Sequence, residues 1–247
     1  MSQQTASPLI EHLVELRSRL IWSLVGIAII SGIFYGFKEE VFQFLIQPLT
    51  DAGIKKLIFT NVPELFFTYL KLSILSGLFV GMPVLLWHMW RFISPGLYDA
   101  EKKVFLPFLL FTPVLFYTGG LFSYFVVTPI AVDFFFQFSN ETIEPLPSVK
   151  EYLSFLIKML FGFGLAFELP LVLLLMARAG IVSAASLAKG RRYAIVGIFA
   201  AAAILTPPDP LSQLLLAVPM AVLYEAAVFG ARLVEQKQQN DAPASGN

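Results

Sequence analysis

The stretch GFGLAFELPLVLLLM, residues 162–176, contains a single ionisable side chain, that of Glu168. Glu168 lies ten positions after Lys158 and ten positions before Arg178, and no other charge falls between these two residues. A helix of about 20 mostly apolar residues is long enough to cross the hydrocarbon core of a bilayer. The stretch therefore predicts a membrane-spanning helix with a carboxyl group near its midpoint.

The composition of the whole chain agrees with this interpretation. Of the 247 residues, 57% are hydrophobic and 14% are charged, whereas soluble domains average about 25% charged residues. Charges divide the chain into six apolar stretches without the period-two alternation of a β-barrel, so we predict an all-α polytopic membrane protein. The six predicted spans cover residues 20–37, 72–90, 104–132, 159–177, 193–208 and 210–231.

The six spans are predicted to form one membrane domain, residues 1–232, followed by a disordered polar tail at 233–247. An even number of spans leaves both ends of the chain on one side. Eleven Lys and Arg residues fall on that side and six on the other, so the positive-inside rule predicts that both termini are cytoplasmic. The last two spans are expected to be short, because the first has only 16 residues and the second has 15 between Asp209 and Glu225, or 22 if Glu225 lies at the inner interface.

Two local patterns predict departures from straight helices. The third span is longer than a bilayer requires, and its Pro113, Gly119 and Pro129 favour a bend. In the first outer loop, Asn61–Glu64 (NVPE) predicts a helix start with Asn61 or Val62 before Pro63 as the first helical residue. Short helices are therefore expected outside the membrane as well as within it.

Several classes of function are excluded by what the sequence lacks. The absence of cysteine excludes disulfides and thiolate metal sites. His12 and His88 are the only histidines, and neither has a second ligand at metal-binding spacing. No catalytic triad pattern or phosphate-binding loop is present, and the net charge is zero. We therefore predict no enzyme activity, no metal, no cofactor and no nucleic-acid partner.

Two charged stretches lie on the predicted cytoplasmic side. In SPLIEHLVELRSRL, residues 7–20, Glu15 and Arg19 form a favourable i,i+4 pair on a predicted helix. In RFISPGLYDAEKK, residues 91–103, a Ser-Pro-Gly turn precedes Glu101. These acids are either solvated charges of an interfacial helix and a capped turn, or groups that bind a cationic ligand.

The carboxyl group of Glu168 also has two interpretations. An unpaired carboxylate at the centre of a span costs at least about 2.5–3.5 kcal/mol on insertion scales, so it should face protein or water, or be protonated. Pro170 cannot donate to the carbonyl of Ala166, and Gly162 and Gly164 allow another backbone to approach. Glu168 is either a protonated group that joins helices or a functional contact.

The outer turn LTPPDPLSQ, residues 205–213, carries three further polar side chains, Thr206, Asp209 and Gln213. Its prolines stop one span and start the next. Asp209 is either the N-cap of the last span or part of a functional loop.

Five stretches, taken in order, resemble one protein family. They are HLVELRSRL at 12–20, FISPGLYDAEKK at 92–103, FSYFVVTP at 122–129, FGLAFELP at 163–170 and LTPPDPLSQ at 205–213. Together they resemble TatC, the multi-spanning subunit of the twin-arginine protein translocase. The resemblance runs from about residue 8 to residue 232.

The resemblance implies a concave, glove-like arrangement of six helices in the cytoplasmic membrane. It implies a receptor that binds twin-arginine signal peptides of folded cargo, associates with itself and with TatA-type and TatB-type single-span subunits, and uses the proton-motive force. The residues it implies for signal binding are Glu15, Arg17, Phe92 and Glu101. It further implies intramembrane contacts with partner helices at Glu168, Thr206 and Gln213, and functional loop positions at Pro48 and Asp209.

Two other functions compete with this one. A proton-coupled secondary transporter with Glu168 as its titrating group would explain the intramembrane acid and the proline-containing spans. It predicts inverted repeats, which the sequence does not show, and leaves the cytoplasmic acids unexplained. A structural scaffold without a transport role is the third possibility. Binding of a purified twin-arginine signal peptide distinguishes the receptor from both.

Overall fold

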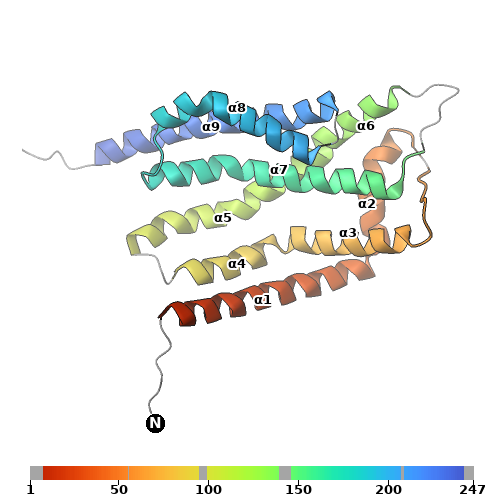
Figure 1. Ribbon diagram of the computed structural model, residues 1–247, viewed down its shortest axis with the longest axis horizontal. Helices are drawn as coiled ribbons and strands as arrows, with labels where there is room; N and C mark the ends of the chain where they lie inside the picture. The colour runs from red at the N-terminus through yellow and green to blue at the C-terminus, as the bar shows by residue number, and fades with distance from the viewer. Residues whose placement is uncertain (1–7, 55, 95–98, 139–145, 207–208, 242–247) are drawn as a thin grey trace, which may run out of the picture. The chain divides into compact units, whose positions relative to one another are not determined.

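The computed structural model describes residues 8–54, 56–94, 99–138, 146–206 and 209–241. Over these ranges the chain is almost entirely helical and contains no named strand, which confirms the predicted all-α class (Figure 1). The contacts divide it into two compact units. The first unit contains residues 1–46 and 59–109, and the second contains residues 47–58 and 110–247.

The first unit is built on the packing of α1 (Pro8–Gly36) against α3 (Glu64–Val80) and α4 (Met82–Ile93). The two long helices approach closely where Gly77 of α3 faces Ser31 of α1. A Cβ atom at Gly77 would lie 2.7 Å from the Ser31 Cα atom. Small residues allow such an approach, which gives membrane helices their packing contacts where the hydrophobic effect contributes little.

The start of α3 follows the predicted NVPE pattern with one difference. Pro63 occupies the N-cap position, and the helix begins at Glu64. The buried Glu64 carboxylate accepts hydrogen bonds from the Thr60 backbone N–H, the Thr60 hydroxyl and the Asn61 backbone N–H. Glu64 therefore turns back and satisfies donors that precede the helix.

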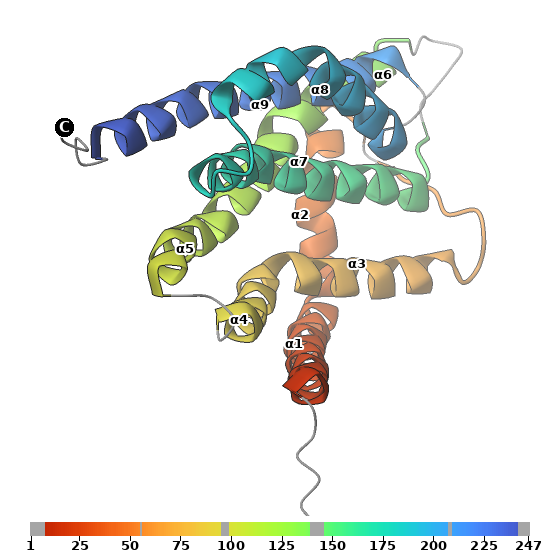
Figure 2. The same ribbon diagram turned by 60° about the vertical axis from the view of Figure 1, so that its left-hand side comes forward.

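The predicted span at 72–90 is divided between two helices in the structure. α3 and α4 meet at Gly81 with a bend of 53°, which is visible in both ribbon views (Figures 1 and 2). Pro83, the second residue of α4, has no N–H to donate to the carbonyl of Phe79, and its ring opposes a straight helix there. The bend is therefore a local consequence of Gly81 and Pro83.

The second unit contains the last part of α2 (Lys38–Asp51) and of α5 (Asp99–Phe122), then η2 (Ser123–Val127) and α6 (Thr128–Phe136). It continues with α7 (Val149–Arg178), α8 (Ala184–Leu205) and α9 (Pro210–Asp241). α9 packs along both α7 and α8. The core of this unit includes the fully buried side chains of Met159, Phe163, Ala202, Leu216 and Ala217.

The expected bend of the third span takes the form of a π-helical turn, η2. Pro129 removes a backbone donor just after this turn. The hydroxyl and the backbone N–H of Thr128 both donate to the carbonyl of Ser123, five positions earlier. The wider i→i+5 spacing therefore satisfies the backbone next to the proline.

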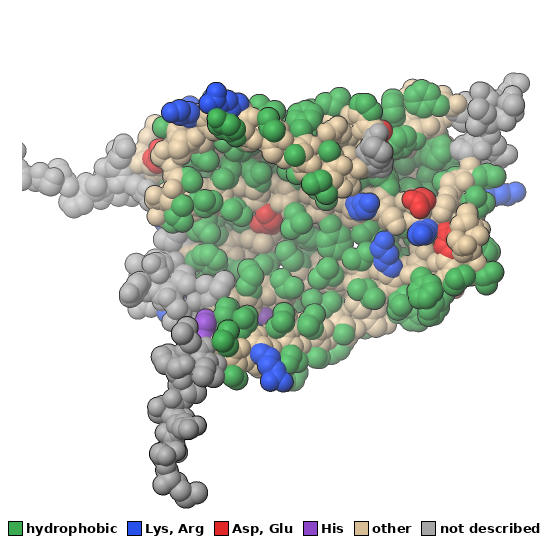
Figure 3. Space-filling model, viewed as in Figure 1, with side chains coloured by type: hydrophobic (Ala, Val, Ile, Leu, Met, Phe, Trp, Pro, Cys, Tyr) green, Lys and Arg blue, Asp and Glu red, His purple; other side chains and the backbone are tan. Residues whose placement is uncertain are grey.

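Among the described helices, four are long and apolar enough to cross a membrane singly, and the bent α3–α4 pair qualifies as a fifth span. α8 has 22 residues and carries Lys189, Arg191 and Arg192 in its first half, where Lys and Arg side chains gather in Figure 3. α9 has 32 residues, so it continues beyond the predicted span into the stretch expected to be a tail.

Candidate functional sites

The first candidate site lies on the N-terminal part of α1. The Arg19 guanidinium donates to a Glu15 carboxylate oxygen at 3.0 Å, which is the predicted i,i+4 pair. Both side chains are partly exposed, and Arg17 between them is exposed. The Glu15 carboxylate is thus paired with the Arg19 guanidinium, and both groups remain accessible to water.

The C-terminal end of α4 lies beside this part of α1 within the first unit. The rings of His12 and Phe92 stack with centroids 4.3 Å apart and planes inclined by 18°. His12 is three positions before Glu15, about 4.5 Å along the helix. The structure therefore brings together Phe92 and the Glu15 segment, which are far apart in the sequence. The side chain of Glu101, near the start of α5, lies outside the described residues.

The second candidate site surrounds Glu168 in the second unit. Its carboxyl group is half-buried on α7 and faces the Thr112 side chain and the Phe116 backbone of α5. One carboxylate oxygen, Oε1, is buried and has no hydrogen-bond partner among the described residues. Glu168 therefore has polar neighbours on a second helix and retains an unused acceptor.

Close packing of α5 on α7 accompanies this acid. A Cβ atom at Gly164 would lie 2.7 Å from the Phe116 ring, and one at Gly119 would overlap the Phe163 carbonyl. Gly162 and Gly164 were expected to allow another backbone to approach, but the space at Gly164 is used by the Phe116 ring and that at Gly162 by the Leu205 side chain. The packing sets the position of Glu168 relative to Thr112.

The outer turn between α8 and α9 contains the third group of predicted residues. The Asp209 carboxylate accepts from the Ser212 backbone N–H at 2.7 Å, as an N-cap of α9 does. Thr206 is buried at the end of α8, and its hydroxyl donates to the Ala202 carbonyl. The Gln213 amide donates to the Phe199 carbonyl at 3.1 Å. The first two contacts are each local to one helix end, and the Gln213 contact joins α9 to α8.

Pro48 of the first outer loop is buried inside α2. With Gln47, Asp51, Tyr124 and other residues it lines a cavity of about 310 Å³ between α2, η2 and α6. Pro48 therefore contributes to the packing of the second unit.

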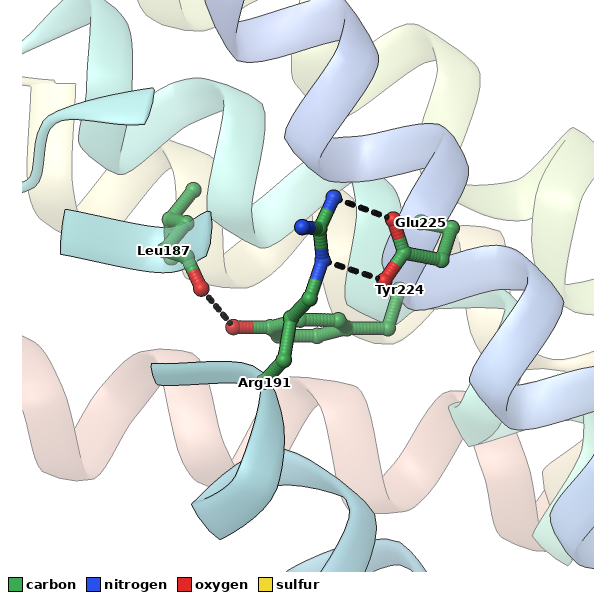
Figure 4. Close-up of polar contacts among 4 residues, drawn as sticks. All are labelled: Leu187, Arg191, Tyr224 and Glu225. Carbon is green, nitrogen blue, oxygen red and sulfur yellow. Dashed lines mark hydrogen bonds and ion pairs between the residues drawn. The ribbon is translucent and has the colours of Figure 1, made fainter. Parts of the chain in front are cut away.

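A polar clamp between α8 and α9 was not predicted as a site. Arg191 Nε and Nη2 donate to the two carboxylate oxygens of Glu225 at 2.7 and 2.8 Å (Figure 4). Beside this pair, the hydroxyl of the buried Tyr224 donates to the Leu187 carbonyl at 2.8 Å. The isolated acid Glu225 near the end of a predicted span was the only sequence signal for this clamp.

The α8–α9 hairpin has one further polar tie, at its other end from Gln213. The Ala184 backbone N–H, at the first turn of α8, donates to the Glu235 carboxylate at 2.6 Å. An acidic side chain at a helix N-terminus satisfies free backbone donors and opposes the positive end of the helix dipole. The hairpin is therefore tied at three levels along its length.

Comparison with known proteins gives one family. Residues 11–219 match the family described as "Sec-independent protein translocase protein (TatC)". Proteins of that name include one from Magnetococcus marinus, 48% identical over 240 residues, which covers 96% of this chain and 89% of the relative. The Escherichia coli protein is 37% identical over 246 residues, with coverages of 97% and 94%.

Two solved structures also resemble this chain. The "Crystal Structure of Twin Arginine Translocase Receptor- TatC" matches with a TM-score of 0.80 and 40% sequence identity, over 91% of this chain and 99% of that one. A structure of the same receptor in the detergent DDM matches with a TM-score of 0.78 over 88% of this chain.

Proposed function

This chain belongs to the TatC family of Sec-independent protein translocase proteins, and we propose that it is the signal-receptor subunit of a twin-arginine translocase. The resemblance read from five sequence stretches and the polytopic membrane class are confirmed by the family match and the solved structures. The chain is a membrane transport component and not an enzyme. Its proposed action is to bind twin-arginine signals and, driven by the proton-motive force, to export folded proteins with partner subunits.

The observation that carries the proposal is the stacking of His12 on Phe92 at 4.3 Å. It joins the N-terminal segment to the end of α4, the two stretches that the family resemblance links to signal recognition. A signal peptide that contacts one of them would meet the other. The proposed site combines Glu15 and Arg17 of α1 with Phe92 and, farther along the sequence, Glu101.

The chemistry of the site suits an arginine pair. A guanidinium binds a carboxylate through two parallel hydrogen bonds, and this geometry distinguishes arginine from lysine. Glu15 already binds the guanidinium of Arg19, so an incoming arginine would replace a like group without leaving the carboxylate unpaired. The site is partly exposed to water, and each such pair is expected to contribute only about 1 kcal/mol after screening.

The proposed contacts with TatA-type and TatB-type subunits lie at Glu168, Thr206 and Gln213. The buried Oε1 atom of Glu168 lacks a partner among the described side chains and could accept from a partner helix. Apolar contacts scarcely distinguish a helix from lipid, so one polar contact can bias association by about 0.6–2 kcal/mol. Pro48 and Asp209 are proposed to hold the outer loops in the form that these contacts need.

The proposed location is the cytoplasmic membrane, with both termini in the cytoplasm. The excess of Lys and Arg on that side supports this orientation. It puts Glu15 on the face from which a newly made signal arrives.

Peptide binding tests the receptor role. Glu15→Ala and Glu101→Ala are each expected to weaken binding of a purified twin-arginine peptide about fivefold, and less at high salt. Glu40→Ala on α2, outside the proposed site, is the matched control and should bind like the parent. A peptide with two lysines should bind weakly to all four proteins. The assignment is wrong if both variants bind the arginine peptide as the parent does at every ionic strength.

Export of a folded reporter tests Glu168 separately. Glu168→Gln keeps hydrogen-bonding capacity and should retain most of the export, whereas Glu168→Leu should lose much of it. A titrating role predicts a different pattern, because neither residue can release a proton. Equal loss in both variants would favour proton coupling, and full export in both would leave Glu168 with a packing role only.

A further inference from the structure

A second cavity of the second unit lies apart from all the residues assigned above. Its volume is about 480 Å³, within the range of small-molecule sites. It opens between α6, α7 and the end of α2, and most of its wall is apolar, including Leu49, Val132, Phe135 and Phe155. Phe135 is 37% exposed, so the apolar wall continues to the surface.

Backbone hydrogen bonds connect the segments around the cavity. The Ile58 backbone N–H donates to the Pro147 carbonyl at 3.1 Å, and the Val149 N–H donates to the Ile58 carbonyl at 2.9 Å. These bonds hold the residue 58 segment against the start of α7, and Pro147 itself lines the cavity. The cavity is thus built from backbone that is fixed on several sides.

The level of the cavity in the membrane follows from the positions of the charged residues on α7. Lys158 precedes Arg178 by twenty positions, about 30 Å along a helix, which equals the hydrocarbon thickness of a bilayer. Arg178 and Lys158 therefore mark the two interfaces, and a Lys side chain at such a position extends its ammonium outward to the headgroups. The cavity lies at the interface opposite Arg178.

Two opposite charges line the cavity on one face of α7. Glu151 and Lys158 are seven positions apart, so they project in nearly the same direction with Glu151 farther from the membrane centre. Both side chains are exposed, and within the described ranges neither has an ion pair or hydrogen bond. Charged side chains of both signs are visible at this end of α7 in Figure 3.

We propose that this cavity binds a phospholipid with an amine headgroup, of the phosphatidylethanolamine class. The phosphate meets the Lys158 ammonium, the headgroup ammonium reaches outward to the Glu151 carboxylate, and the start of an acyl chain packs against Phe155 and Val132. The order of the two charges along α7 matches the order of phosphate and amine from the membrane centre outward. Under the proposed topology this lipid belongs to the outer leaflet.

Lipid binding by the purified full-length chain tests the charges. The probes are dioleoyl phosphatidylethanolamine, phosphatidylcholine and phosphatidylglycerol at equal concentration, with bound lipid read by native mass spectrometry. The parent should prefer phosphatidylethanolamine. Lys158→Gln should weaken binding of all three about fivefold, and Lys56→Gln, which removes a lysine outside the cavity wall, should not. Glu151→Gln should abolish only the preference for ethanolamine over choline, whose ammonium carries no N–H.

Occupancy of the cavity itself is tested by filling it. Ser154→Trp places a large side chain into the cavity and leaves both charges in place, so it should reduce phosphatidylethanolamine binding as strongly as Lys158→Gln. The melting temperature of each variant is measured in parallel to confirm folding. Equal lipid binding by the parent and all of these variants would overturn the proposal, because the lipid would then be unspecific.

A photoreactive residue at position 154, activated in native membranes, identifies the occupant. An adduct with the mass of a phospholipid supports the proposal, whereas an adduct with a polypeptide, whether a second copy or a partner subunit, overturns it. The control is the same probe at Leu165, which is 59% exposed on α7; lipid adducts there and none at 154 also overturn it. Binding of a twin-arginine peptide is measured on the same variants and is expected to be unchanged, so the two proposals fail separately.

Discussion

Two ion pairs of the same chemistry serve different structural purposes in this chain. Glu15 and Arg19 lie four positions apart on α1 and share one contact of 3.0 Å. Arg191 and Glu225 lie on different helices, share two contacts of 2.7 and 2.8 Å, and are flanked by the Tyr224 hydrogen bond. Breaking the first pair changes no helix contact, whereas breaking the second releases a tie between α8 and α9. Glu15, the acid proposed to bind a signal arginine, thus belongs to the local pair.

The helices that carry these two pairs also differ in how much of their surface is buried. Only 11% of the apolar window of α1 is buried within the protein, against 39% of that of α9. α9 packs along both α7 and α8, whereas α1 packs along α3 and α4, with a very close approach where Ser31 faces Gly77. A larger share of α1 than of α9 therefore stays exposed, and the stability of the first unit is expected to be sensitive to the close approach at Ser31 and Gly77.

The largest effect is expected from Gly77→Ala. The added Cβ atom would lie 2.7 Å from the Ser31 Cα atom and closer still to its hydroxyl oxygen, so α1 and α3 must separate. Overpacking of this kind costs about 1–3 kcal/mol. The melting temperature of the purified protein should fall clearly. Gly32→Ala on α1 is the control, because its Cβ meets no atom within 4 Å, and equal melting temperatures for the two variants would contradict the proposed importance of the close approach at Gly77.

A charge reversal of the interhelical pair should come next. Arg191→Glu puts two carboxylates side by side on α8 and α9, and the melting temperature is expected to fall. Combining it with Glu225→Arg restores opposite charges and should recover most of the loss. The same exchange within α1, Glu15→Arg with Arg19→Glu, should leave the melting temperature unchanged. A double variant of the hairpin no more stable than Arg191→Glu alone would show that the clamp does not depend on pairing.

A smaller effect is expected from Tyr224→Phe. The change removes one hydrogen bond to the Leu187 carbonyl and keeps the ring in its buried position, at a cost of about 1 kcal/mol. Thermal unfolding measures the loss, and Tyr193→Phe, an exposed position on α8, is the control. A loss no greater than that of the control would show that the Tyr224 hydrogen bond does not stabilise the hairpin.

The smallest effect is expected from Arg19→Gln. It frees the Glu15 carboxylate and, if the local pair competes with a signal arginine, tightens binding of a twin-arginine peptide by up to about fivefold. Stability should be unaffected because the pair joins no second helix. Titration of the peptide at low and high salt measures the gain. Weaker binding by this variant would mean that Arg19 holds Glu15 in its binding conformation and does not compete.

Much of the fold could be predicted from short-range patterns. The spacing of Lys158, Glu168 and Arg178 indicated a full span, and α7 covers it as one helix. The NVPE pattern located the start of α3 to within one residue, and Pro129 indicated a departure from α-helix, which the structure shows as η2. Each of these features depends on residues that belong to one continuous segment of the chain.

The candidate site was predicted only in part, because only some of its contacts join residues close in the sequence. The Glu15–Arg19 pair was expected because i,i+4 side chains meet on any helix. The stacking of His12 on Phe92 could not be expected, because it depends on the 53° bend between α3 and α4, which directs the end of α4 toward α1. The signals for that bend, Gly81 and Pro83, are present in the sequence, but they do not specify a direction.

The sequence by itself determined where helices run through apolar surroundings, because an uncompensated charge in hydrocarbon costs several kcal/mol wherever the helix packs. It therefore determined the membrane class and the isolation of Glu168. Only the tertiary structure decided which polar groups meet. Arg191 and Arg192 are adjacent in the sequence, but only Arg191 pairs with Glu225, thirty-four positions away. The packing of α8 along α9 directs the Arg191 guanidinium toward the acid, whereas the Arg192 guanidinium lies against Tyr193.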